Sequence, residues 1–338
     1  MTITTQAFGN GATLYTLTNN QQVSLSATDL GARIVNWIIP TKEGNKKNIV
    51  LGFDNAQDYK TIDHYLGSTI GRVAGRIAKG NFIIDQQAYH VKTQGEHTLH
   101  GGPDSFETKL WKTTIDEDKN QLIFSYFSLD DENGFPGNLK VQVTYTLTED
   151  NEWLIDYYAN TDAPTLFNPT NHVYFNLTGD HEQTIHSHTL QLASESFAVV
   201  NPDVTVTGEK RCVEGTPFDF RKPQKLAQVF NTDYEQNKLV GGLDHPFFLE
   251  KTNQPQAIIT SPDETITVEM MTDEDAVVIF TGNFGPDKTD GSQKIRNFTG
   301  VTLETQASPG AIEFKNFGDI ILRPNQNYHS QTRFKVTF

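Results

Sequence analysis

Apolar and polar residues alternate with a period of two along much of the chain. The clearest run is 140–147, where every second residue is apolar and the residues of that apolar face are Val141, Val143, Tyr145 and Leu147. Successive side chains of a strand point to opposite faces, so this run predicts a half-buried antiparallel strand. A polar turn at 148–151 leads to a similar run at 153–158, and the two runs together predict a β-hairpin.

Two further pairs of short apolar runs predict hairpins, 82–84 with 89–91 and 111–115 with 122–126. Helical patterns are few and short, and they fall at 54–59, 223–230 and 233–239. Parallel strands need repeated crossover helices, which these patterns cannot supply. The chain is therefore predicted to be all-β, a large antiparallel sandwich of two or more sheets with few short helices, in a single domain over 1–338.

The charge balance narrows the possible partners. The chain has 338 residues and a formal net charge of -15, from 27 Lys and Arg against 42 Asp and Glu. Such a surface repels phosphate backbones and anionic lipid headgroups. We therefore expect neither a nucleic acid nor a membrane as partner.

Cysteine usage and the first residues bear on the compartment. Cys212 is the only cysteine, so no disulfide can form within the chain. The segment 1–6 lacks a basic stretch followed by an apolar run. Together these features predict a cytoplasmic protein.

An acidic residue lies inside one predicted strand, 301–306. Alternation places Glu304 on the face opposite Leu303 and Thr305. An acid in a strand lies either on a solvent face or in a cavity, and a cavity raises its pKa. Glu304 is therefore a candidate acid–base residue, although a solvent-facing carboxylate fits the pattern equally well.

Two histidines lie next to loop or strand boundaries. His100 precedes two glycines, which predict a tight loop that presents the imidazole, and His97 lies three residues before it. This spacing is that of metal ligands on a helix, but the glycines argue against a helix and hence against a metal site. His172 lies just ahead of an aromatic strand, where a core histidine bonded to a carbonyl is the simpler reading.

Two glycine-rich segments carry further charged residues. Arg72 and Arg76 lie within 71–80, and Asp244 follows Gly241 and Gly242. Glycines permit a close backbone approach to a ligand, and guanidinium groups offer paired hydrogen-bond donors. Solvated turn residues are the structural alternative for both segments.

These segments occur in an order that closely resembles the aldose 1-epimerase family, the galactose mutarotases. The resemblance covers nearly the whole chain, because the segments follow one another with the family's order and spacing. The segments that carry it are 30–37, 71–82, 99–102, 134–137, 169–177, 215–221, 243–246 and 303–306.

The resemblance implies a fold, a site and a chemistry. It implies a large antiparallel β-sandwich with a shallow sugar cleft, and catalysis without a metal or organic cofactor. It assigns Glu304 as the general base and His172 as the general acid, with His100 as a second imidazole near the sugar ring oxygen. It also assigns Arg76 and Asp244 to the sugar hydroxyls. Which histidine is the dominant acid stays open.

The implied activity is the interconversion of the α and β anomers of free hexoses such as galactose and glucose. The implied partner is a free monosaccharide, and the chain is expected to be a monomer or a homodimer. Two positions depart from the family pattern: Gly75 stands where many relatives have Asn, and Val278 where some have Gln. Both departures concern hydroxyl contacts, and hence the preferred sugar.

Three other functions remain compatible with the same residues. Asp244 and Glu304 could be the two carboxylates of a glycosidase. A non-catalytic sugar-binding module would use the same aromatic residues without a base. An epimerase of hexose 6-phosphates would need a basic cluster, for which Arg72 and Lys79 are the candidates.

Overall fold

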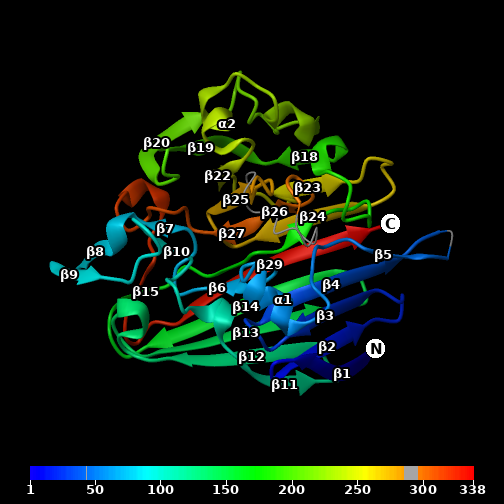
Figure 1. The fold of residues 1–338 in the computed structure, drawn as a ribbon, viewed down its shortest axis with the longest axis horizontal. Helices are drawn as coiled ribbons and strands as arrows, with labels where there is room; N and C mark the ends of the chain where they lie inside the picture. The colour runs from blue at the N-terminus through cyan, green and yellow to red at the C-terminus, as the bar shows by residue number, and fades with distance from the viewer. Residues whose placement is uncertain (43, 285–295) are drawn as a thin grey trace.

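The computed structural model of the protein describes residues 1–42, 44–284 and 296–338. Strands paired into antiparallel sheets make up most of these residues, and the described part has two short α-helices, α1 (Ala56–Thr61) and α2 (Glu235–Val240) (Figure 1). The prediction of an all-β antiparallel fold is therefore confirmed. Neither helix has the length or the apolar character needed to cross a bilayer.

The three predicted helical patterns differ in outcome. Those at 54–59 and 233–239 correspond to α1 and α2. The pattern at 223–230 contains only a 3₁₀ turn, Leu226–Val229. Its first residues are extended instead, because Gln224–Lys225 form strand β21 and pair with β18 (Thr189–Leu192).

A nine-stranded sheet forms one layer. The predicted hairpin of 140–147 and 153–158 is confirmed in it as β13 and β14, with Thr144 opposite Asp156. In spatial order its strands are β11 (Lys112–Asp116), β12 (Gln121–Ser128), β13 (Leu139–Leu147), β14 (Glu152–Thr161), β29 (Tyr328–Thr337), β24 (Thr267–Thr272), β23 (Ala257–Thr260), β18 (Thr189–Leu192) and β21.

The N-terminal strands form a five-stranded sheet beside this layer. Its strands are β1 (Thr2–Gly9), β2 (Ala12–Thr18), β3 (Ser24–Thr28), β4 (Arg33–Pro40) and β5 (Lys46–Asn48). The indole of Trp37 on β4 meets that of Trp153 on β14 edge to face, with ring centroids 5.9 Å apart. Both indoles are fully buried, so this contact lies in the core between the two sheets.

A second five-stranded sheet carries the cleft described below. In spatial order its strands are β20 (Val206–Cys212), β19 (Ser194–Val200), β22 (Asp244–Leu249), β25 (Ala276–Phe280) and β27 (Glu304–Gln306). On one face of this sheet Phe247 and Val277 belong to the main buried core, which the sheet shares with the nine-stranded layer. The Thr305 hydroxyl also meets that of Thr332 on β29 at 2.6 Å.

Short strand pairs position the loops at the edge of the sheets. The hairpin predicted from 82–84 and 89–91 is confirmed among them as β8 and β9. These strands are β6 (Thr69–Ile70), β7 (Arg76–Ile77), β8 (Asn81–Ile84), β9 (Gln87–His90), β10 (Thr98–Leu99), β15 (Thr165–Leu166), β16 (Thr170–Asn171), β17 (Tyr174–Phe175), β26 (Val301–Thr302) and β28 (Ile321–Leu322).

Candidate active site

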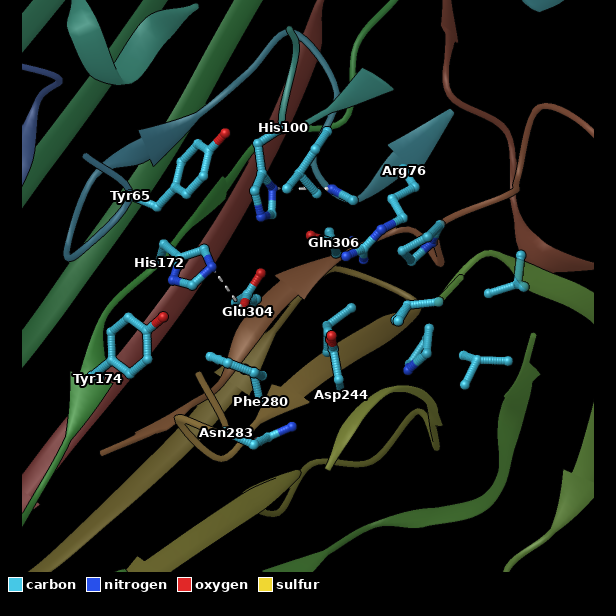
Figure 2. A pocket seen from close by; sticks show the side chains of 18 of the residues that line it. Tyr65, Arg76, His100, His172, Tyr174, Asp244, Phe280, Asn283, Glu304 and Gln306 are labelled. Atoms are coloured by element: carbon cyan, nitrogen blue, oxygen red, sulfur yellow. Dashed lines mark hydrogen bonds and ion pairs between the residues drawn. The ribbon is translucent and has the colours of Figure 1, made fainter. Parts of the chain in front are cut away.

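A cleft of about 240 Å³ opens between the second five-stranded sheet and the loops beside it (Figure 2). Its lining combines charged side chains, histidines and aromatic rings with a group of valines and prolines. The lining residues are Asp63, Tyr65, Gly75, Arg76, Leu99, His100, His172, Tyr174, Val200, Val204, Val206, Asp244, Pro246, Val278, Phe280, Asn283, Phe284, Glu304, Gln306 and Pro309.

The floor of the cleft is formed by side chains that lie on one face of β27 and β22. On β27 Glu304 and Gln306 face the cleft, whereas Thr305 between them points to β29. On β22 Asp244 and Pro246 face the cleft in the same way. Glu304 is therefore a cavity residue, and the alternative of a solvent-facing carboxylate is wrong, since its side chain is only 3% exposed.

The pairing of β7 with β10 brings Arg76 and His100 to one side of the cleft. Arg76 lies opposite Leu99 in this pair, so His100 follows directly at the end of β10. The backbone N–H of Gly75 donates to His100 Nδ1 at 3.3 Å, and the N–H of His100 donates to the Gly75 carbonyl at 3.0 Å. Because Nδ1 accepts a hydrogen bond, the proton of the neutral imidazole lies on Nε2.

His172 is held between β16 and β17 by its own backbone. Its N–H donates to the Ser68 carbonyl and its carbonyl accepts from the Gly67 N–H, each at 2.9 Å. The side chain of Asn171 reinforces this position, because its amide donates to the Gly67 carbonyl at 3.0 Å and to the Tyr145 hydroxyl at 2.8 Å. The location of the imidazole thus follows from a rigid backbone.

His172 and Glu304 face each other in the buried part of the cleft. His172 Nε2 lies 3.4 Å from Glu304 Oε1, and their side chains are 7% and 3% exposed. The Thr302 hydroxyl donates to the same carboxylate oxygen at 2.9 Å. In Figure 2 the ring of His172 lies beside both the ring of His100 and the carboxylate of Glu304. The two imidazole rings meet edge to face, and their centroids are 5.1 Å apart.

Burial dominates the electrostatics of these groups. It raises the pKa of the Glu304 carboxyl, and the His172 imidazole and the Thr302 hydroxyl oppose this rise. It also raises the pKa of Asp244, against the opposing effect of Arg76 and His172. The pKa of His100 is held well below its usual range by burial, with His172 and Arg76 adding to the effect. His100 is therefore neutral around pH 7.

A buried arginine outside the cleft holds one of its walls. Arg33 donates to backbone carbonyls of the turn before β6, those of His64 and Leu66, and to that of Glu107. This turn presents the ring of Tyr65, which packs on His100 with centroids 4.7 Å apart. Arg33 thereby stabilises the wall without contacting the cleft.

Comparison with known proteins places these features in a family. The model of the aldose 1-epimerase family matches residues 13–335. The aldose 1-epimerase of Escherichia coli (strain K12) is 32% identical over 329 residues, which cover 95% of this chain and 94% of that protein. The galactose mutarotase of Homo sapiens is 35% identical over 316 residues, with 91% and 89% covered.

This chain belongs to the aldose 1-epimerase family. It is accordingly an isomerase, an epimerase that acts on carbohydrates. Solved structures agree: the GalM/aldose epimerase homologue from C. elegans superposes with a TM-score of 0.87 at 27% identity, covering 95% of this chain and 98% of that one. The galactose 1-epimerase from Lactobacillus acidophilus NCFM gives a TM-score of 0.86 at 26% identity, with 99% and 98% covered.

The structure brings all five residues predicted from the sequence of this family member into one cleft. They are Arg76, His100, His172, Asp244 and Glu304, and the two departing positions, Gly75 and Val278, line it as well. Their catalytic and binding roles stay predictions.

Gln306 and Tyr65 are among the cleft residues that the sequence reasoning did not identify. Gln306 lines the cleft, yet both polar atoms of its buried amide lack a partner in the described part of the protein. Its position two residues after Glu304 on the same strand could have revealed it. Tyr65 lies in an irregular turn, and no sequence period marks its approach to His100.

One sequence interpretation of a nearby residue needs correction. Arg72 is neither a solvated turn residue nor available to a phosphate, because it is buried. Its guanidinium donates to Ser128, Leu129, Pro136 and Thr165. His97, three residues before His100, accepts from the Lys79 N–H through Nδ1, and its Nε2 lies 3.2 Å from Asp203 Oδ2.

Proposed function

We propose that this family member is an aldose 1-epimerase that interconverts the α and β anomers of free hexoses such as galactose and glucose. The observation that carries the proposal is the buried pair of His172 Nε2 and Glu304 Oε1, 3.4 Å apart, at one end of a cleft of sugar size. Anomer exchange needs one group that takes a proton and one that gives a proton, and this pair supplies both.

Glu304 acts as the general base in this proposal. Its carboxylate removes the proton of the hydroxyl group on C1 while the bond from C1 to the ring oxygen breaks, which leaves an open-chain aldehyde. Rotation about the C1–C2 bond then exposes the other carbonyl face, and the steps run in reverse. Burial raises the pKa of Glu304, so its carboxylate is a stronger base than that of an exposed glutamate.

His172 acts as the general acid and protonates the ring oxygen as the ring opens. Its Nε2 lines the cleft and lies 3.4 Å from the Glu304 carboxylate, where it can donate a proton to a substrate oxygen. His100 is less suited to this role, because its pKa lies well below the usual range. We therefore assign His100 as a neutral donor that binds a sugar oxygen through its Nε2–H.

Arg76 and Asp244 hold sugar hydroxyls in this proposal. Both line the cleft next to the reacting pair, one as a hydrogen-bond donor and the other as an acceptor. Such contacts orient the substrate so that C1 lies between base and acid. A cytoplasmic location and a monomeric or homodimeric state stay predictions.

Saturation-transfer NMR on free aldoses tests the proposal. We expect exchange between the two anomers of glucose and galactose to accelerate with enzyme concentration, and glucose 6-phosphate to be a poorer substrate because no basic cluster lines the described cleft beside Arg76. Sugar binding without acceleration would identify a binding module. Release of reducing sugar from glycosides, with no anomer exchange, would identify a glycosidase.

A further inference from the structure

The loop that carries His100 has an uncommon backbone conformation. His100 follows β10 with a φ of 50°, in the left-handed region that residues other than glycine seldom adopt. The next two residues, Gly101 and Gly102, also have positive φ values, 90° and 105°. A β-carbon on Gly101 would lie 2.2 Å from the Gly71 carbonyl oxygen, so the loop packs closely against the segment that follows β6. The position of the His100 imidazole therefore depends on the hydrogen bonds that hold this loop.

Ser105 holds the loop at His100 itself. Its buried hydroxyl lies 2.7 Å from the His100 carbonyl oxygen. Further along, the Asn133 amide donates to the carbonyls of Gly101 and Asp104, at 3.0 Å and 3.1 Å. A buried carbonyl that loses its donor is costly, because no water replaces the hydrogen bond. The Ser105 hydroxyl therefore helps to keep the His100 backbone in its left-handed conformation.

The same hydroxyl also contacts a buried carboxyl group. Ser105 Oγ lies 2.5 Å from Oε2 of Glu107, a residue of the 3₁₀ turn Phe106–Thr108 that is 1% exposed. A serine hydroxyl has a single proton to donate, and a backbone carbonyl can only accept. Both contacts can be hydrogen bonds at the same time only if the Glu107 carboxyl is protonated. It then donates to Ser105, and Ser105 donates to His100.

The surroundings of the Glu107 carboxyl favour its protonated form. Burial raises its pKa to about 7, although Ser105 and two cations, Arg33 and Lys109, oppose this rise. Arg33 approaches from β4, and its guanidinium donates to the Glu107 carbonyl. The other hydrogen bonds of this guanidinium also go to backbone carbonyls. Arg33 is thus committed to the backbone rather than to the carboxyl group.

Two more titratable side chains lie close enough to interact with the same carboxyl. Lys109 Nζ lies 3.0 Å from Asp104 Oδ2 and 3.3 Å from Glu132 Oε1, so other carboxylates compensate its charge. Tyr65, from the turn before β6, stays neutral, because burial raises the pKa of its hydroxyl and Glu107 adds to this effect. A single proton on Glu107 therefore decides the direction of the Ser105 hydroxyl.

We propose that protonated Glu107 and Ser105 are positioning residues for His100, in which the carboxyl donates to Ser105 and Ser105 donates to the His100 carbonyl. The inference rests on the proposed function, in which the His100 Nε2–H binds a sugar oxygen. When Glu107 loses its proton to solvent, the Ser105 proton turns to the carboxylate, because a charged acceptor forms the stronger hydrogen bond. The His100 carbonyl then lacks its donor, and the loop that presents the imidazole is held less firmly. Sugar binding therefore weakens as the pH rises.

The test measures KM and kcat for anomer exchange on glucose between about pH 6 and about pH 8.5 in the wild type, Glu107→Gln and Ser105→Ala. We expect the KM of the wild type to rise about three- to tenfold over this range, the scale of one lost hydrogen bond. The amide of Glu107→Gln can donate to Ser105 at every pH, so its KM should stay low. Ser105→Ala should have a high KM at both ends of the range. The pH course of kcat should be the same in the wild type and Glu107→Gln.

A second measurement detects the proton on Glu107 without relying on catalysis. The infrared difference spectrum of the wild type minus Glu107→Gln should contain the C=O stretch of a protonated carboxyl group at about pH 6, and this band should disappear at about pH 8.5. The measurement keeps the inference testable if Ser105→Ala fails to fold.

Ser261→Ala is the matched control. Ser261 is also a buried serine that donates to a carboxylate, that of Asp263 at 2.6 Å, and it lies outside the cleft. Its KM should follow that of the wild type at every pH, even if its melting temperature falls.

Two results would overturn the inference: the same pH course of KM in the wild type and Glu107→Gln, or a difference spectrum without the carboxyl band. A merely structural role of Glu107 would lower the folded fraction in Glu107→Gln and leave the pH course of KM unmoved. Absence of anomer exchange on every free sugar would instead overturn the proposed function, and the infrared band would still report the proton on Glu107.

Discussion

The ring centroids of His100 and His172 lie 5.1 Å apart, but the two imidazoles have different hydrogen-bond partners. His100 receives the Gly75 N–H on Nδ1, and its pKa is held well below the usual range. His172 directs Nε2 to a carboxylate, and its buried Nδ1 has no partner within the described residues. In the proposed function, the same side chain therefore serves as a neutral donor at one position and as the partner of a base at the other.

Glu304→Gln should have the largest effect, because it removes the group that gives His172 its distinct role. The amide keeps the shape but cannot accept a proton, and we expect anomer exchange to fall about 10⁴-fold. Polarimetry on fresh α-glucose measures the rate, and calorimetric titration should show that the sugar still binds. Glu250→Gln, an exposed glutamate after β22, is the control. A wild-type rate in Glu304→Gln would refute the base assignment.

His172→Asn should come next, with a loss of about 10²- to 10³-fold in kcat, the usual contribution of a general acid. The measurement is the exchange rate per folded molecule, with the folded fraction taken from a thermal melt. His90→Asn, in the exposed hairpin of β8 and β9, is the matched control. If His172→Asn lowered only the melting temperature, His172 would be a core histidine and the two imidazoles would not differ as proposed.

His100→Asn should have a smaller effect, about tenfold in kcat/KM, which is the loss of a neutral hydrogen bond. Because His100 is already neutral, we expect the shape of the pH–rate profile to stay that of the wild type. His172→Asn should change that shape. A changed profile in His100→Asn, with an unchanged one in His172→Asn, would exchange the roles of the two histidines.

Thr302→Val should have the smallest effect, because it changes only the hydrogen bonding of the Glu304 carboxylate. The Thr302 hydroxyl lowers the pKa of Glu304, so its removal should raise that pKa further. The base is active when deprotonated, and the acid limb of kcat/KM should therefore move to higher pH, by about one unit or less. Rate loss would then be greatest at low pH and nearly absent at high pH.

Two control variants accompany the pH profile of Thr302→Val. Thr302→Ser keeps the hydroxyl and should retain the wild-type profile. Thr305→Val changes a buried threonine of β27 whose hydroxyl meets Thr332 on β29, away from the cleft, and its profile should also match the wild type. An acid limb that moved to lower pH in Thr302→Val would contradict the hydrogen bond to the Glu304 carboxylate.

The alternation of apolar residues was sufficient to predict the strands and several of their pairs. The hairpin of β13 and β14 depends on residues close in sequence, and its pattern specifies both the strand and its buried face. Similarly, alternation predicted that Glu304 lies on the face opposite Thr305. It could not predict whether that face meets solvent or a cavity, because this depends on the loops that cover it.

The roles of the two arginines in 71–80 show the same limit. Both are arginines in the same glycine-rich segment, yet Arg72 is buried among carbonyls and Arg76 lines the cleft. The difference arises from partners more than fifty residues away, such as Ser128 and Thr165. No local pattern carries that information.

The sequence by itself determined the all-β class, the acidic charge and, through an ordered set of segments, the membership of a family with five candidate residues. Only the tertiary structure decided that Glu304 faces His172, that His100 is neutral, and that Arg72 is buried away from the cleft. The physical reason is that strand periodicity is a local property, whereas burial and hydrogen bonding of a side chain depend on contacts between distant segments.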